Sequence, residues 1–392
     1  RNAGLVLREI VAIGPAASSF GSRIARGAIR LSACLDAATR GPFFARSTPS
    51  APLRRPLGTS AVRSLPSRSA DLYAGPSMLS AAILLGPQRH VPIVRPAVES
   101  LVARDVRPLA VVTAGWEERE NEDQELRDHV QRPVQNLEIW ARVERIFERD
   151  RELLSAMRQR HDTLRRVQEL YRLRLHGAME ATKELFRRPG DDLWTTAERH
   201  DALVMLQGID SQHVERVAQV HAEFEMRWRP GERSAVQRER REIKAKLAEA
   251  SCLLVAGGHI AVLLHRLRLF DVFGLYGDRP VVAWSAGAMA LCERIVLFHD
   301  LPPQGSSNAE VMEAGFGLVP DLVPLPHAKR RLLTEDARNV QLFARRFAPT
   351  TLSSARAGSD ESPYDRPRPR LNTAPTVMRS RSSLCTSRPG AG

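Results

Sequence analysis

Short apolar runs, each ended by small residues, alternate with helical patterns over much of the chain. Residues 80–85 and 108–113 are two such runs, and residues 252–256 and 280–284 are two more. Continuous apolar runs of this length are typical of strands buried on both faces of a parallel sheet. Residues 335–347 have helical spacing. The pattern predicts an α/β fold with a doubly wound, mostly parallel sheet.

Residues 117–250 have a different pattern. They are dense in Glu, Arg, Gln and Leu, and Pro189-Gly190 and Pro230-Gly231 divide them into about three long helices. One apolar stripe recurs at three- and four-residue steps: Leu164, Val167, Tyr171 and Leu175. We therefore expect a long all-helical insertion with solvated charged faces. It would pack on the main domain or on a partner subunit, which makes it a candidate surface for a homo-oligomer.

The net charge of +13 is concentrated at the two ends of the chain. Residues 1–70 carry a net charge of +9 and residues 351–392 carry +4, so the middle is neutral. Both ends are rich in Arg, Ser and Pro, and no convincing strand follows Pro349. We expect disordered basic tails at 1–76 and 351–392 around an α/β domain at 77–350. The composition of 1–76 also resembles a transit peptide.

The neutral middle argues against a specific nucleic-acid groove, because such a groove needs clustered basic residues. Cys34, Cys252, Cys292 and Cys385 are scattered, which argues against a metal site or a disulfide framework. The chain has no run of 18 apolar residues, so we expect no membrane span and a cytoplasmic protein.

Ser285 directly follows the apolar run at 280–284 and precedes Ala286, Gly287 and Ala288. A Ser between a strand and a small-residue helix start is the context of a nucleophile elbow. The small neighbours allow the sharp turn that lifts the Ser side chain above the sheet edge. The N–H of Ala286 would then face a developing oxyanion.

Three further features supply the other groups that a Ser nucleophile needs. Gly257 and Gly258 end another apolar run, where a bare backbone N–H can face the same oxyanion. Asp300 follows Ser285 by 15 residues, and His327 follows it by 42. Together these residues predict a nucleophile, a base, an orienting acid and two oxyanion donors at strand ends.

These residues resemble a known family. Residues 284–288, the Gly257-Gly258 turn and residues 300–302 resemble dipeptidase E, and residues 315–318 followed by His327 resemble cyanophycinase. Both are serine peptidases on the class I glutamine amidotransferase-like fold. The resemblance covers roughly residues 79–350, within which the helical stretch is much longer than in dipeptidase E.

The resemblance implies a role for each residue. Ser285 would be the nucleophile, His327 the general base and Asp300 its orienting acid, with Gly258 and Ala286 as the oxyanion hole. It also implies small or Asp-containing peptide substrates, with no metal or cofactor.

Two other segments bear on the resemblance. The family's Gly-Gly-Asn turn ends in His259 here, so His259 is a candidate substrate-binding residue. Residues 113–120 resemble a segment of uncharacterised relatives.

Two other enzyme families and a non-enzymatic protein are the alternatives. In an α/β-hydrolase the acid lies several strand–helix units beyond the Ser, and the 15 residues to Asp300 are too few for that. A glutamine amidotransferase needs a Cys at the elbow, and Cys292 lies two helical turns on, about 10 Å away. The third alternative is a catalytically inactive scaffold whose helical insertion mediates protein interactions.

Overall fold

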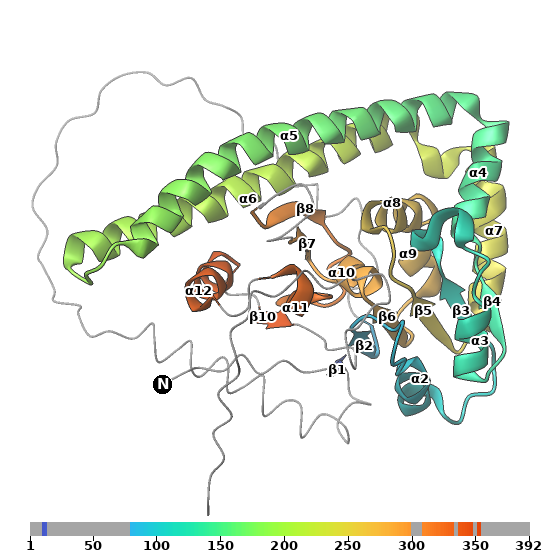
Figure 1. The fold of residues 1–392 in the computed structure, drawn as a ribbon. Coiled ribbons are helices and arrows are strands. Elements are labelled where there is room, and N and C mark those ends of the chain that lie inside the picture. Colours follow the sequence, from blue (N-terminus) through green and yellow to red (C-terminus); the bar gives the residue numbers. More distant parts are fainter. Residues whose placement is uncertain (1–9, 14–78, 299–307, 333–335, 348–350, 354–392) are drawn as a thin grey trace, which may run out of the picture. The chain divides into compact units, whose positions relative to one another are not determined.

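The computed structural model describes residues 10–13, 79–298, 308–332, 336–347 and 351–353 (Figure 1). These residues belong to one compact unit, Arg1–Gly358. Its largest sheet has the strand order β1-β2-β6-β5-β3-β4. The strands are β1 (Ile10–Ile13), β2 (Ala82–Leu85), β3 (Leu109–Val112), β4 (Val134–Asn136), β5 (Cys252–Val255) and β6 (Val281–Trp284).

Five strands of this sheet are parallel, and only β1 pairs in the antiparallel sense, with β2. β2, β3, β5 and β6 are buried along their whole length. Successive residues enter opposite apolar clusters, so that Val112 lies in one and Val111 in the other. The prediction of an α/β fold with a mostly parallel, doubly covered sheet is confirmed.

Helices cover both faces of this sheet. One face packs against α2 (Val94–Val102) and α3 (Gln124–Val130). The other packs against α4 (Ile139–Arg149), α7 (Ser234–Glu249), α8 (Ile260–Phe270), α9 (Val272–Tyr276) and α10 (Ala286–Leu291). Two short 3-10 helices, η3 (Ala114–Arg119) and η4 (Pro230–Glu232), lie in connections.

Two long helices, α5 (Arg151–Arg187) and α6 (Leu193–Trp228), form a hairpin. Asp150 caps α5, and Asp192 caps α6 by accepting from the N–H groups of Trp194 and Thr195. The breaks fall at Pro189-Gly190 and Pro230-Gly231, as the sequence predicts. Figure 1 shows the hairpin running past β7 (Arg294–Leu297) and β8 (Glu310–Ala314), which pair with each other in the antiparallel sense.

The remaining described elements lie on the chain after β8. They are β9 (Leu322–Pro324), α11 (Ala328–Arg331), α12 (Ala337–Arg346) and β10 (Thr351–Ser353), of which β10 pairs in parallel with β9. A third apolar cluster joins residues of β7, β8, β9 and α12 to the inner face of the α5–α6 hairpin.

Three expectations were wrong in detail. The 117–250 stretch is not all helical, because Val134–Asn136 forms the edge strand β4 beside β3. Ile10–Ile13, inside the expected N-terminal tail, forms β1. The strand thought to be missing after the last helix is Thr351–Ser353. Val134–Asn136 and Thr351–Ser353 have three residues each and include polar ones, so they form no apolar run. Ile10–Ile13 is a short apolar run, but it stands alone in a segment rich in Arg and Ser.

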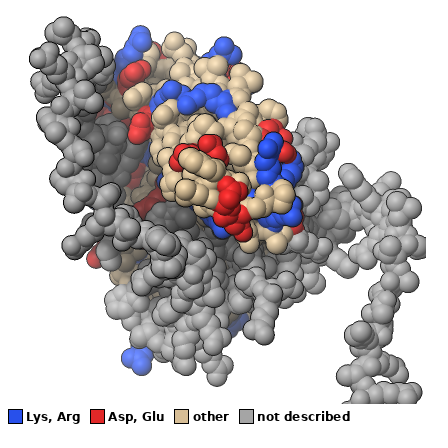
Figure 2. Space-filling model, turned by 90° about the vertical axis from the view of Figure 1, so that its left-hand side faces the viewer, with Lys and Arg blue, Asp and Glu red and all other residues tan. Residues whose placement is uncertain are grey.

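Exposed residues of α5 form short-range ion pairs, such as Arg166–Glu169 at 3.5 Å and Glu184–Arg187 at 3.8 Å. On the face shown in Figure 2, Lys and Arg side chains lie among Asp and Glu side chains and uncharged surface. Pairs at this spacing are typical of a solvated helix surface. Within the described part of the chain, no helix combines the length and apolarity that a bilayer span requires.

Candidate active site

Ser285 stands at a sharp turn between β6 and α10. Its backbone has φ 53° and ψ −120°, a region that residues with a side chain rarely adopt. Its N–H donates to the carbonyl oxygen of Leu85 on the neighbouring strand, at 3.1 Å. A strained Ser between a strand and a helix is the geometry of a nucleophile elbow. The half-buried Ser285 therefore lies where the sequence predicts a nucleophile.

Two glycines allow the backbone to close around this turn. A Cβ on Gly287 would lie 2.2 Å from the carbonyl oxygen of Val255, at the end of β5. A Cβ on Gly257 would lie 2.7 Å from Cβ of Ser285 and 3.3 Å from the nitrogen of Ala286. Any side chain at either position would displace backbone or Ser285. Gly257 is thus the residue directly against Ser285, a role that the sequence analysis did not assign.

The two predicted oxyanion donors lie on either side of this contact. Ala286 is the first residue of α10, and Gly258 has φ 112°. A Cβ on Gly258 would lie 2.2 Å from the carbonyl oxygen of Gly115, so only glycine fits there. Among the backbone hydrogen bonds of the described residues, neither of the two N–H groups is a donor. Their role as oxyanion donors stays a prediction.

His259 caps the next helix. Its Nδ1 accepts from the N–H of Val262 at 3.3 Å, and its ring is exposed at the start of α8. The backbone N–H of His259 donates to Gly115 at 2.7 Å. The contact explains why a His can occupy this turn, because its ring nitrogen replaces the usual oxygen of an N-cap. Its role in binding substrate stays a prediction.

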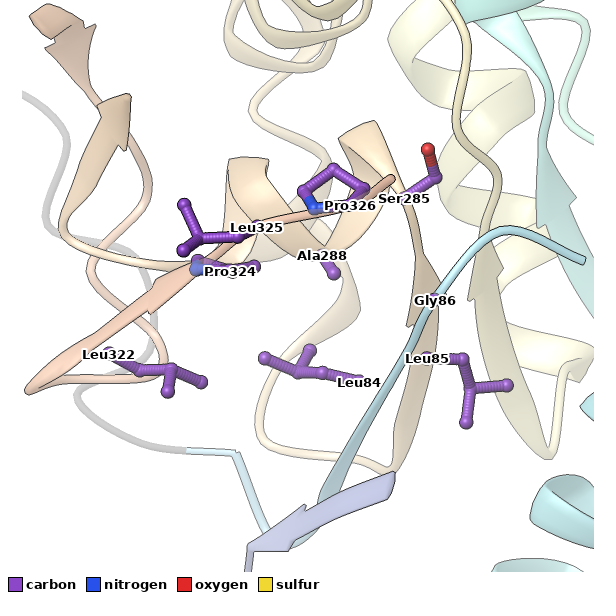
Figure 3. A pocket seen from close by; sticks show the side chains of 9 residues that line it. All are labelled: Leu84, Leu85, Gly86, Ser285, Ala288, Leu322, Pro324, Leu325 and Pro326. Carbon is purple, nitrogen blue, oxygen red and sulfur yellow. The ribbon is translucent and has the colours of Figure 1, made fainter. Parts of the chain in front are cut away.

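The chain that leads to His327 shares a small pocket with Ser285. The pocket has a volume of about 20 Å³, enough for roughly one water molecule. Ser285 and Pro326 lie at the same end of it (Figure 3). His327 follows at once, with φ 61°, as the residue before α11. The fold thus brings the segment before His327 to the elbow.

Asp300 and Cys292 are the other two residues that the sequence analysis considered. Asp300 lies outside the described residues. Cys292 is buried at the end of α10, where its Sγ lies 3.4 Å from the carbonyl oxygen of Ala288. Burial raises the pKa of this thiol far above its ordinary value, so it stays protonated and is a poor nucleophile. The triad of Ser285, His327 and Asp300 stays a prediction.

Glu117 is a feature that the sequence analysis missed. Its φ of 59° and ψ of −127° nearly repeat those of Ser285. It lies in η3, whose Gly115 crosses the Gly257-Gly258 turn. The resemblance of residues 113–120 to relatives was the available signal, but it gave no reason to choose this residue.

One buried cluster has donor groups of the kind that bind metals. The ligand atoms of His221, His265 and Glu313 lie within 4.8 Å of one another. Each imidazole Nε2 lies 2.7–2.8 Å from a Glu313 oxygen. Arg268 also donates to Glu313, at 2.6 Å, and its positive charge would compete with a metal ion. The carboxylate is satisfied by these partners, so the cluster links α6, α8 and β8 as a structural network.

The profile of peptidase family S51 matches residues 205–351, which include the Gly257-Gly258 turn, Ser285 and His327. This segment, less than half of the chain, is therefore similar to peptidase family S51. The resemblance to dipeptidase E and cyanophycinase that the sequence predicted is therefore confirmed. The matched segment begins within α6, so it includes the part of that helix from residue 205 onward.

Among solved structures, the crystal structure of a peptidase from an acI-B1 Actinobacterium matches with 18% sequence identity and a TM-score of 0.20. The match covers 34% of this chain and 55% of that chain, little more than half of its length. The comparison with curated proteins gives no match. The family assignment therefore rests on residues 205–351.

Proposed function

We propose that the protein is a serine peptidase that hydrolyses small or Asp-containing peptides. The observation that carries the proposal is Ser285, which has the positive φ of a nucleophile elbow inside the segment that matches a peptidase family. The backbone fit around it supports the same conclusion, because a Cβ on Gly257 would lie 3.1 Å from the Ser285 hydroxyl, and Gly287 lets α10 pack closely against the end of β5.

We further propose that the sheet is of the class I glutamine amidotransferase-like type. Five parallel strands in the order β2-β6-β5-β3-β4 support it, with the nucleophile after β6. In open sheets of this kind, ligands bind beyond the carboxyl ends of the strands. Ser285, the Gly257-Gly258 turn and η3 all follow such ends.

The proposed reaction begins when Ser285 Oγ attacks the carbonyl carbon of the scissile peptide. His327 takes the hydroxyl proton, while the N–H groups of Ala286 and Gly258 donate to the oxyanion. His327 then returns the proton to the leaving amine as the C–N bond breaks and an acyl-enzyme forms. A water molecule, deprotonated by His327, hydrolyses the acyl-enzyme and restores Ser285.

In this mechanism Asp300 acts only on His327. Its carboxylate would hold the imidazole in the correct tautomer and stabilise the imidazolium that forms at each transfer. The strained turn at Ser285 places its Oγ at the start of α10, where the positive end of the helix would favour the anionic intermediate. No step in this sequence uses a metal or a cofactor.

A fluorophosphonate probe tests the proposal, because it reacts with activated Ser nucleophiles whatever the substrate. We expect stoichiometric labelling of the wild-type protein and none of Ser285→Ala. His327→Ala should lower the labelling rate roughly 10³-fold or more, and Asp300→Asn on the order of 10²-fold. Intact-protein mass spectrometry would measure the labelled fraction.

Cys292→Ala is the matched control and should label like the wild type, because its thiol is buried and protonated. If the folded wild-type protein does not label, the chain is an inactive scaffold and the proposal is wrong.

A further inference from the structure

The residues on both sides of His327 pack against the α5–α6 hairpin. Leu325 and Ala328 are 5% and 2% exposed, and they share an apolar cluster with inner-face residues of both long helices. The hairpin contributes Tyr171, Leu175, Ala178, Met179, Leu206 and Ile209 to this cluster. The hairpin therefore packs against the segment that carries the proposed general base.

A buried polar network also links the hairpin to α12, which follows His327 in the chain. The Arg346 guanidinium on α12 donates to both oxygens of Asp210 on α6, at 2.6 and 2.8 Å. The Tyr171 hydroxyl on α5 donates to Asp210 at 2.7 Å and accepts from the N–H of Val311 at 3.0 Å. Arg346 also donates to the carbonyl oxygen of Ala309 at 2.7 Å. Four elements thus meet at one ion pair.

This ion pair is almost completely shielded from water. The side chains of Asp210 and Arg346 are each 1% exposed, and Tyr171 is also 1% exposed. A buried charge without its partner is strongly unfavourable, so Asp210 requires α12 to dock on α6. A second contact between these helices runs from Gln207 to the carbonyl oxygen of Arg345, at 3.1 Å. The position of α12 is therefore set by charge as well as by apolar packing.

His327 lies on the segment between the two docked parts. Before it, β9 and Leu325 pack on the cluster, and after it Ala328 and α12 do so. His327 itself has a left-handed backbone, φ 61°, which a residue with a side chain adopts at a cost. Such a conformation persists only where the surroundings hold it, and Leu325 and Ala328 on either side of His327 are buried in the cluster that includes the hairpin.

We propose that the α5–α6 hairpin holds the catalytic base in place, with Asp210 as a positioning residue that acts on His327 through Arg346 and α12. The inference rests on the proposed function, since it takes His327 as the general base. It assigns the long helices a role inside the enzyme.

Asp210→Asn tests the inference, because it keeps the shape of the side chain and removes its charge. The readouts are the maximal labelling rate by the fluorophosphonate, the probe concentration for half-maximal rate, and the pH profile, all measured well below the Tm of each variant. We expect the maximal rate to fall about 10-fold or more, because a small displacement of a base is costly. The half-maximal concentration should stay within about 3-fold.

The pH profile separates positioning from mere folding. A His that moves away from its carboxylate is a weaker base, so the acidic limb should shift to lower pH in Asp210→Asn. Asp201→Asn, on the exposed side of the same helix, is the matched control and should leave rate and profile unchanged. Tyr171→Phe removes a single donor to Asp210 and should give a smaller change in the same direction.

Three outcomes are distinguishable. An Asp210→Asn variant with a lowered Tm but wild-type rate and pH profile overturns the inference and leaves the proposed function intact. A wild-type protein that does not label overturns both. If Asp210→Asn does not fold, Tyr171→Phe decides, and an unchanged rate and profile there overturns the inference.

Discussion

Glycines have opposite surroundings in the two main parts of the molecule. Around the elbow, a Cβ on Gly257 or Gly287 would meet the nucleophile or backbone at 2.2–2.7 Å. In the hairpin, a Cβ on Gly177 or Gly208 would meet nothing within 4 Å. The elbow is fixed by backbone packed on backbone, and its tolerance to added atoms is correspondingly low.

The hairpin is held by side chains instead. Asp210 and Glu313 are buried carboxylates, each bound by an Arg from another element. These ion pairs can be broken one at a time by a change of charge. The close backbone packing at the elbow is instead sensitive to added side-chain volume. We therefore expect added side-chain volume to destabilise the elbow, and altered charge to destabilise the packing of the hairpin.

The largest effect should come from volume at the elbow. Gly287→Ala would place Cβ 2.2 Å from the Val255 carbonyl oxygen, so α10 must move away from β5. We expect a loss of about 3 kcal/mol in the free energy of unfolding, at the upper end for overpacked sites, and loss of fluorophosphonate labelling. Urea denaturation followed by circular dichroism measures the first quantity.

Gly177→Ala is the matched control in α5. It should raise the free energy of unfolding by up to about 1 kcal/mol, because Ala favours a helix and the site is open. If Gly177→Ala destabilised the protein and Gly287→Ala did not, the prediction that the elbow is the more sensitive to added volume would be wrong.

Acidic pH should lower the free energy of unfolding by a comparable amount, through protonation of His221 in α6. Burial lowers the pKa of His221 from 6.5 to about 4, despite the opposing contact with Glu313. As the pH falls below about 6.5, the unfolded chain takes up this proton before the folded one does. The folded state should therefore lose stability between pH 6.5 and pH 4, on the order of 3 kcal/mol from this group.

Denaturation curves at pH 7 and pH 4.5 would measure the loss. The pKa of His265 is also lowered by burial, so it adds to the effect. His221→Leu should flatten the pH dependence, whereas His176→Gln, an exposed site on α5, should leave it as it is. A wild-type stability that is constant over this range would contradict the prediction.

The smallest effect should come from Glu117, which has the backbone strain of the elbow without a nucleophile. Glu117→Gly removes the Cβ at φ 59°, and we expect the free energy of unfolding to rise by about 1 kcal/mol. Glu118→Gly, next to it and without a positive φ, should lower it by about 0.5–1 kcal/mol. Equal effects at the two positions would show that the strain is not costly.

The parts predicted well from the sequence were those with local signals. β2, β3, β5 and β6 are uninterrupted apolar runs, and Ser285 stands among small residues at the end of one. β8 was missed, because its inward residues are Val311 and Glu313. From sequence alone a Glu is expected at the surface. Burial of Glu313 can be understood only from its partners His221, His265 and Arg268. Those partners lie 45–92 residues away in sequence, beyond the reach of any local pattern.

The Asp210–Arg346 pair also constrains how the chain can fold during synthesis. Its partners are 136 residues apart, and α12 is made after nearly all the other described elements. Until then, the nascent hairpin lacks the partner of Asp210, which lies among the residues of α6 that become buried, such as Ile209 and Val217. Non-local contacts of this kind slow folding, because the intervening chain must be ordered first. The hairpin should thus complete its packing only after α12 has emerged from the ribosome, so that the segment carrying the proposed base His327 is fixed late.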